Sequence, residues 1–176
     1  MAESAGCASM EPWLRLDSAS EADARRLLTM CCGSKRWVDR MMARRPFASR
    51  IALQRAAAEE WNMLDPSDWR EAFSHHPKIG DRESVEARLP AVRALSEQEQ
   101  AGVSDAPAAI LDALAEGNRR YEERFGYIFI VCATGKRAEE MLTLLHRRLP
   151  NDESIELRVA AMEQQKITAL RLDGLT

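Results

Sequence analysis

Residues 127–133 read YIFIVCA, the longest uninterrupted apolar run of the chain and the one segment whose β-branched and aromatic residues favour a strand. No second run of this kind is available to pair with it, and a single strand has no sheet to join. The run is also far shorter than the roughly 20 apolar residues that a membrane-spanning helix needs. We therefore expect a buried extended segment inside an otherwise helical protein.

Helix signals stand on both sides of this segment. Upstream, Pro107 opens a long helix with an apolar stripe, and Gly126 ends it. Downstream, one helix is predicted up to Pro150 and another from about Asn151 to Gly174. The segment is therefore expected to connect two helices.

The N-terminal half begins with two more predicted helices. Ser18 is a candidate N-cap with Glu21 three residues later, which is the capping-box pattern, and Gly33 is the expected stop. The second helix must end before Pro46, because a proline disfavours helical backbone at the residue before it.

Two further helices precede the histidines. Residues 48–64 are rich in alanine, and their apolar positions, including Ile51 and Trp61, predict a loosely amphipathic helix. Asp65 caps the next helix, with Pro66 at its first position. The sequence thus predicts an all-α protein, a bundle of about eight or nine helices with one buried extended segment.

Length and composition are those of one globular domain. At 176 residues the chain can bury a sizeable core, and we expect residues 13–176 to form that domain and residues 1–12 to be disordered. The net charge of -3 shows no excess of basic residues, which binding to nucleic acid or to an anionic membrane would require. Neither is expected as a partner.

The cysteines and the termini point to a cytoplasmic protein. The four cysteines have no C-x-x-C or metal-ligand spacing, and two of them are adjacent, so they are interpreted as reduced thiols. The N-terminal residues lack the basic and apolar regions of a secretory signal, and the C-terminal DGLT is not a peroxisomal address.

The stretch FSHHPKIGD, residues 73–81, holds two of the three histidines of the chain. Pro77 fixes the backbone after His76, so the His76 imidazole should project from a rigid corner, which suits general acid or base catalysis. Alternatively, the histidine only hydrogen-bonds a helix-end carbonyl. A metal site is disfavoured, because adjacent side chains such as His75 and His76 usually diverge and the third histidine, His146, lies far along the chain.

A second polar constellation is LSEQEQAGV, residues 95–103. Ser96 followed by Glu99 is another capping box, in which the glutamate satisfies a backbone N–H. The same helix N-terminus could instead receive an anionic or carbonyl-bearing ligand, with Ser96, Glu99 and Gln100 contacting its polar edge. The two interpretations are compatible.

Two other features have a structural and a functional interpretation. The backbone groups of residues 127–133 need hydrogen-bond partners, which neighbouring loops, water or a small polar ring could supply. Arg171 stands at the edge of the apolar face of the last helix, where an arginine extends its head into water or holds a carboxylate with two parallel hydrogen bonds.

Two alternatives to an acid–base enzyme remain open at this point. The first is an all-helical interaction module without catalysis, in which the four tryptophans form the core or a groove for a partner. The second is a thiol enzyme that uses Cys31 and Cys32, or Cys132, although the usual C-x-x-C is absent.

Four stretches, in chain order, together resemble a known family. EAFSHHPKIGD, SEQEQAGV, NRRYEERFGYIFIVCATG and RLPNDESIELRVAAMEQQKITALRL are similar to the 2-oxo-4-hydroxy-4-carboxy-5-ureidoimidazoline (OHCU) decarboxylases of urate degradation. The resemblance runs from about Leu14 to Leu172, and KIGD after the His-Pro pair is closer to bacterial than to animal members. It implies a carboxy-lyase that converts OHCU to (S)-allantoin without a cofactor or metal, as a homodimer.

The resemblance also implies site residues. His76, Glu99 and Arg171 match catalytic side chains, although Arg158 lies near enough to compete with Arg171 for that alignment. Pro77 matches a substrate contact. Two further groups match substrate-binding segments: Ser96, Glu97, Gln98, Glu99 and Gln100, and Phe129, Ile130, Val131, Cys132 and Ala133.

Overall fold

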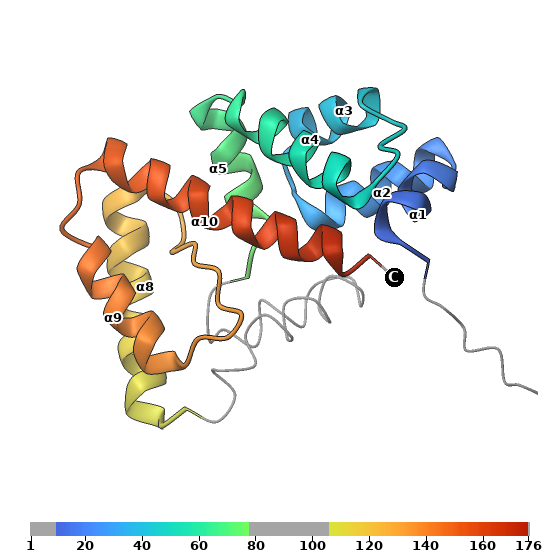
Figure 1. Ribbon diagram of the computed structural model, residues 1–176. Coiled ribbons are helices and arrows are strands. Elements are labelled where there is room, and N and C mark those ends of the chain that lie inside the picture. The colour runs from blue at the N-terminus through green and yellow to red at the C-terminus, as the bar shows by residue number, and fades with distance from the viewer. Residues whose placement is uncertain (1–9, 78–105, 176) are drawn as a thin grey trace, which may run out of the picture.

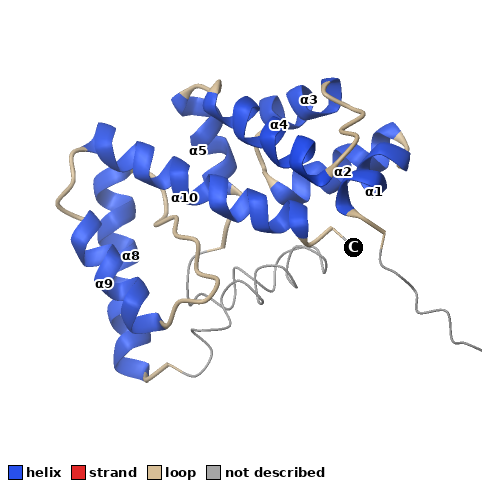
Figure 2. Cartoon of the chain, viewed as in Figure 1, coloured by secondary structure: helices blue, strands red, loops and turns tan. Residues whose placement is uncertain are grey.

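The computed structural model describes residues 10–77 and 106–175, and within these ranges every regular element is a helix (Figures 1 and 2). The helices are α1 (Pro12–Ser18), α2 (Glu21–Cys31), α3 (Lys35–Ala43), α4 (Arg50–Asn62), α5 (Pro66–Ser74), α8 (Ala108–Phe125), α9 (Ala138–Arg148) and α10 (Glu153–Asp173). The predicted all-α fold is confirmed. The predicted disordered N-terminus stays a prediction: α1 begins at its boundary, and residues 1–9 lie outside the described ranges.

The apolar run at 127–133 lies outside the helices and is buried, as predicted. None of its residues is in a helix or strand, and all except the half-buried Ile128 are buried. It follows Gly126, which ends α8 in the left-handed conformation with a φ of 75°. The segment thus belongs to the core of a helical protein.

The predicted N-cap of the helix that ends near Gly33 is wrong by two residues. Ser18 is the last residue of the short helix α1, and Ser20 caps α2 by accepting a hydrogen bond from the Asp23 N–H. Both serines lie before an acidic residue three positions on, so the local pattern suits either one. Pro12 favours Ser20 as the cap of α2, because a proline in the first turn starts the separate helix α1, which includes Ser18.

The apolar face predicted for residues 48–64 is correct except at its start. Ile51 is 80% exposed in the first turn of α4, whereas Leu53, Ala57 and Trp61 are buried. Ile51 and Leu53 lie two residues apart, which places them on different sides of a helix. Leu53 faces the core, so Ile51 faces away from it.

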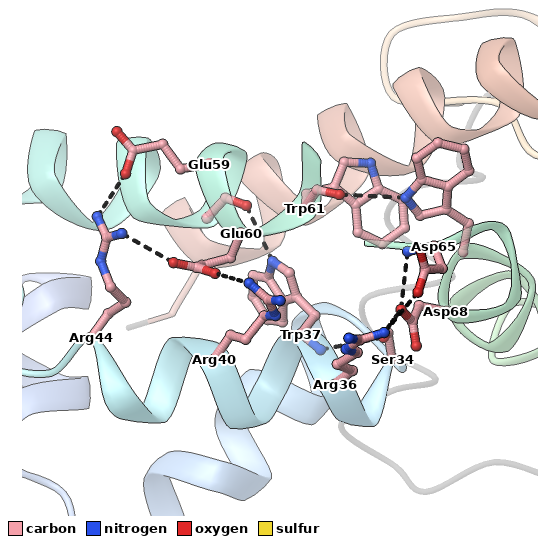
Figure 3. Close-up of polar contacts among 12 residues, drawn as sticks. Ser34, Arg36, Trp37, Arg40, Arg44, Glu59, Glu60, Trp61, Asp65 and Asp68 are labelled. Atoms are coloured by element: carbon pink, nitrogen blue, oxygen red, sulfur yellow. Dashed lines mark hydrogen bonds and ion pairs between the residues drawn. The ribbon is translucent and has the colours of Figure 1, made fainter. Parts of the chain in front are cut away.

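The helices α3 and α4 are held together by a tryptophan and a buried carboxylate (Figure 3). The Trp37 indole N–H donates to the Ala57 carbonyl at 3.1 Å. The buried Glu60 accepts from Arg40 and from Arg44, each at 3.0 Å. Two cations and a well-packed setting compensate the cost of burying this carboxylate.

The other helices are arranged along the long helix α10 (Figure 1). Figure 1 shows α8 and α9 beside its N-terminal part and the N-terminal helices beside the rest. The Trp61 indole N–H of α4 donates to the Ala161 carbonyl at 3.0 Å, and the Gln54 amide donates to the Ala169 carbonyl at 2.9 Å. The later residue of α4 contacts the earlier residue of α10, so the two helices are antiparallel.

The tryptophans take part in the core. Trp37 and Trp61 are buried, and Trp13 and Trp69 are partly buried and pack against the same cluster. This arrangement favours the core over a groove for a partner. Among the helices of the two described ranges, none combines the length and apolar character that crossing a bilayer requires.

Candidate active site

The double histidine stands where α5 ends. The N–H groups of His75 and His76 donate to the carbonyls of Ala72 and Phe73, each at 3.1 Å, which closes the last turn. His76 is half-buried and Pro77 is buried. The predicted position of His76, immediately past the helix and before a fixed proline, is therefore the observed one.

His75 packs against the junction between α2 and α3. A Cβ built on Gly33 would lie 2.3 Å from Cγ of His75 and 2.5 Å from its Cβ. Such distances are far inside van der Waals contact, so only glycine permits this approach. His75, although exposed, thus ends α5 in close contact with the α2–α3 junction, one residue before the candidate catalytic histidine.

Arg171 reaches the same junction from α10. Its side chain is only 5% exposed, and its guanidinium donates to the carbonyl of Met30, in the last turn of α2, at 3.2 Å. The interpretation of Arg171 as a surface arginine with its head in water is therefore wrong. Arg158, by contrast, is exposed. The two residues are thirteen positions apart, which is roughly 140° around a helix axis, so only Arg171 faces the interior.

Cys32 lies in the same junction, and its surroundings disfavour thiol chemistry. Burial raises the pKa of Cys32 to about 12, and hydrogen bonds with Ser34 and Thr168 and the charge of Arg171 only partly oppose this shift. A catalytic thiol needs a lowered pKa and access to its reagent. The adjacent Cys31 is also buried.

The α2–α3 junction is thus a meeting point of three elements. Gly33 receives His75 from the end of α5, while Met30 and Cys32 face Arg171 of α10. Residues that are almost a hundred positions apart in sequence are brought to one corner. The His75 imidazole and the buried Arg171 guanidinium therefore contact the same junction, and His76 is the residue that follows His75.

The extended segment obtains its hydrogen-bond partners from helix side chains. Arg148 donates to the Ile130 carbonyl at 2.8 Å, the Cys132 N–H donates to Glu163 at 2.8 Å, and Lys136 donates to the Cys132 carbonyl at 2.7 Å. The sequence had suggested loops, water or a bound ring for this role. For these three groups, side chains of or next to α9 and α10 perform it.

A buried polar cluster stands behind the segment. Arg148 binds Glu156 through Nε at 2.7 Å and Nη2 at 2.6 Å, and Tyr121 donates to the same carboxylate oxygen. Burial raises the pKa of Tyr121, so its hydroxyl remains a donor. Sequence reasoning missed this cluster, because an arginine in RRLP and a glutamate in DESIE are typical of solvated helix ends.

The second predicted constellation lies outside the described residues. Ser96, Glu97, Gln98, Glu99 and Gln100 all fall in the range 78–105, so their role remains a prediction. The roles of His76, Pro77 and Arg171 are also predictions, although their positions are now known.

Comparison with protein families identifies the chain. The family model described as OHCU decarboxylase matches residues 17–173. The chain belongs to the OHCU decarboxylase family. This match spans α2 to α10 and includes every predicted site residue, so the resemblance found in the sequence motifs is confirmed.

Two relatives of the chain are a plant protein and a fish enzyme. The chain is 38% identical over 146 residues to the uric acid degradation bifunctional protein TTL of Arabidopsis thaliana, covering 83% of this chain and 45% of that protein. It is 32% identical over 131 residues to the OHCU decarboxylase of Amia calva, covering 74% of each. The chain therefore spans less than half of the plant protein and three quarters of the fish enzyme.

One solved structure agrees with the family assignment, and a second agrees with the fold. A crystal structure described as OHCU decarboxylase in the presence of (S)-allantoin matches with a TM-score of 0.70 and 37% identity, covering 84% of this chain and 94% of that one. An (S)-allantoin synthase structure matches with a TM-score of 0.65 at 17% identity, which shows the fold alone.

Proposed function

We propose that this protein decarboxylates OHCU to (S)-allantoin without a cofactor. The family match over residues 17–173 carries this proposal. The α2–α3 junction supports it, because the His75 ring and the Arg171 guanidinium both contact this junction and His76 is the next residue after His75. An interaction module without catalysis is disfavoured by the buried tryptophans, and a thiol enzyme by the raised pKa of Cys32.

The substrate itself can accept the electrons of the reaction. Its name places a hydroxyl and a carboxylate on ring carbon 4 and a ureido group on carbon 5, next to an unsaturated ring nitrogen. When the bond between carbon 4 and the carboxylate breaks, its electron pair forms a double bond between carbons 4 and 5. The π electrons of the C=N bond at carbon 5 then move to the ring nitrogen, which takes up a proton. Loss of the hydroxyl proton and delivery of one proton to carbon 5 then give allantoin and CO₂.

The protein must therefore orient the substrate and manage protons. We assign proton transfer to His76 and Glu99, and retention of the carboxylate to Arg171. A positioned acid or base typically contributes 10²–10⁴-fold. A carboxylate held perpendicular to the ring gains a comparable factor, because its bond then overlaps the π system that receives the electrons. Protonation from one face accounts for a single-handed product.

The decisive experiment follows the handedness of the product. OHCU is generated freshly from urate by upstream enzymes, this protein is added, and the optical activity of the allantoin is recorded over time. Spontaneous decay gives a racemate. Faster decay with accumulation of (S)-allantoin is the expected result, and racemic product at the spontaneous rate would refute the proposal.

A homodimer and a cytoplasmic location are also proposed. The family resemblance suggests the dimer, and α10 carries exposed apolar side chains, Ile155, Met162 and Leu170, which a second copy could cover. Cytoplasmic location is supported by the four cysteines, whose spacing matches neither a disulfide framework nor a metal site. Light scattering after gel filtration tests the dimer, and a monomeric mass at micromolar concentration would refute it.

A further inference from the structure

The helices α8 and α9 run parallel to each other. A Cβ on Gly117 of α8 would lie 2.3 Å from Leu145 of α9. One turn later, Arg148 of α9 donates to Tyr121 of α8 at 3.3 Å. The later residues of one helix thus contact the later residues of the other. Figure 1 shows the same arrangement. The connecting chain must therefore return along α9, whose 11 residues are about 16 Å long. Extended backbone covers that distance in roughly five residues.

Extended backbone directs the groups of successive residues to opposite sides. The N–H and C=O of one residue point to one side, and those of its neighbours point to the other. In this segment the carbonyl of Ile130 and both backbone groups of Cys132 are bound by protein side chains. On an extended backbone the groups of Ile130 and Cys132 share one side, the even-numbered edge, and those of Phe129 and Val131 share the other side.

Two charged side chains hold Cys132. Glu163, on α10, accepts from its N–H, and Lys136, just before α9, donates to its carbonyl. Burial alone would raise the pKa of Glu163, but hydrogen bonds with Lys166 and the Cys132 N–H outweigh it and hold this pKa below its usual value. Glu163 is therefore charged at neutral pH, and hydrogen bonds to charged groups are the stronger class.

We propose that Glu163 and Lys136 are positioning residues: by fixing the even-numbered edge of the segment, they align the odd-numbered backbone groups with the substrate ring. This rests on the proposed function, for which residues 129–133 are a substrate segment. A ring that carries an oxo group beside ring nitrogens presents acceptors and donors along one side. An edge of extended backbone presents the complementary donors and acceptors in a fixed order.

The experiment compares three variants in the full-length protein with fresh OHCU. Glu163→Ala removes the acceptor of the Cys132 N–H, and kcat/KM should fall roughly 10- to 100-fold, mainly through KM. Glu163→Gln keeps an amide oxygen in that place and should restore kcat/KM to within about threefold of the original. Lys166→Ala is the control, because it removes the ion pair of the same carboxylate but leaves the bond to Cys132.

The outcomes separate the positioning role from the activity itself. If the unaltered protein does not accelerate OHCU decay, the proposed function fails. If it does, and Glu163→Ala keeps its KM and kcat, or loses activity no more than Lys166→Ala, the positioning role fails. If Glu163→Ala does not fold, Lys136→Met replaces it: a raised KM supports the role, and an unchanged KM overturns it.

Discussion

The imidazole of His75 lies directly over Gly33, so closely that a methyl group on that glycine would be 2.3 Å from the ring carbon Cγ. This contact fixes the end of α5 against the α2–α3 junction. Because His76 is the next residue, the contact also sets the position of the candidate catalytic ring.

Gly33→Ala should therefore impair both stability and activity. The added methyl meets Cβ and Cγ of His75, which cannot move without the end of α5, and overpacking of this kind costs about 1–3 kcal/mol of unfolding free energy. Thermal unfolding and the rate of (S)-allantoin formation measure the two effects. Gly174→Ala is the control, since its nearest contact would be an ordinary 3.5 Å. A fully active and stable Gly33→Ala would contradict the contact.

His76→Ala should lose roughly 10²–10⁴-fold in kcat, because a positioned proton donor or acceptor is removed. Its melting temperature should change little, since the His76 side chain is only half-buried. His146→Ala, which changes an exposed histidine of α9, is the matched control and should keep full activity. Undiminished single-handed product from His76→Ala would exclude the assigned role.

Glu99→Gln separates chemistry from helix capping. The amide keeps the shape of the side chain and can still accept a hydrogen bond, but it no longer exchanges a proton. We expect a loss of kcat of at least about 10²-fold with unchanged thermal unfolding. A lowered melting temperature with normal kcat would instead assign Glu99 to the helix cap.

Arg171→Lys tests which arginine holds the substrate carboxylate. Lysine keeps the charge but cannot form two parallel hydrogen bonds, so kcat/KM should fall roughly 10- to 100-fold. Arg158→Lys, on the exposed side of α10, should leave kcat/KM unchanged. The reverse result, with only Arg158→Lys impaired, would move the assignment to Arg158.

Asp173 should make folding stability depend on pH in the acid range. Hydrogen bonds from Arg50, opposed by partial burial and aided by Gln54, hold the pKa of Asp173 below its ordinary value of 3.8. Its contribution to stability is therefore fully present above pH 3.8 and is lost as the pH falls through the folded value. Urea unfolding of Asp173→Asn should show reduced stability at pH 7 and a smaller difference near pH 3. A difference independent of pH would argue against this ion pair.

Local patterns predicted helix ends well where one residue decides the geometry. Pro66 and Gly126 mark the start of α5 and the end of α8 as expected. Ser18 and Ser20 show the limit: both precede an acidic residue at the capping distance, and only the separate helix α1 selects Ser20. The orientation of Arg171 could have been inferred, because it shares a helical face with buried Leu157 and Gln164.

Short-range backbone preferences and the order of motifs were enough to predict the helical fold, the buried segment at 127–133, the family and the candidate catalytic residues. The contact of His75 with Gly33, the approach of Arg171 to the α2–α3 junction and the hydrogen bonds of Glu163 and Lys136 to Cys132 arise from the packing of the helices and could not be predicted. These contacts join different helices or a helix and a loop. The charge and spacing of side chains in the sequence do not show whether a glutamate or lysine lies in solvent or forms a hydrogen bond with the backbone of another segment.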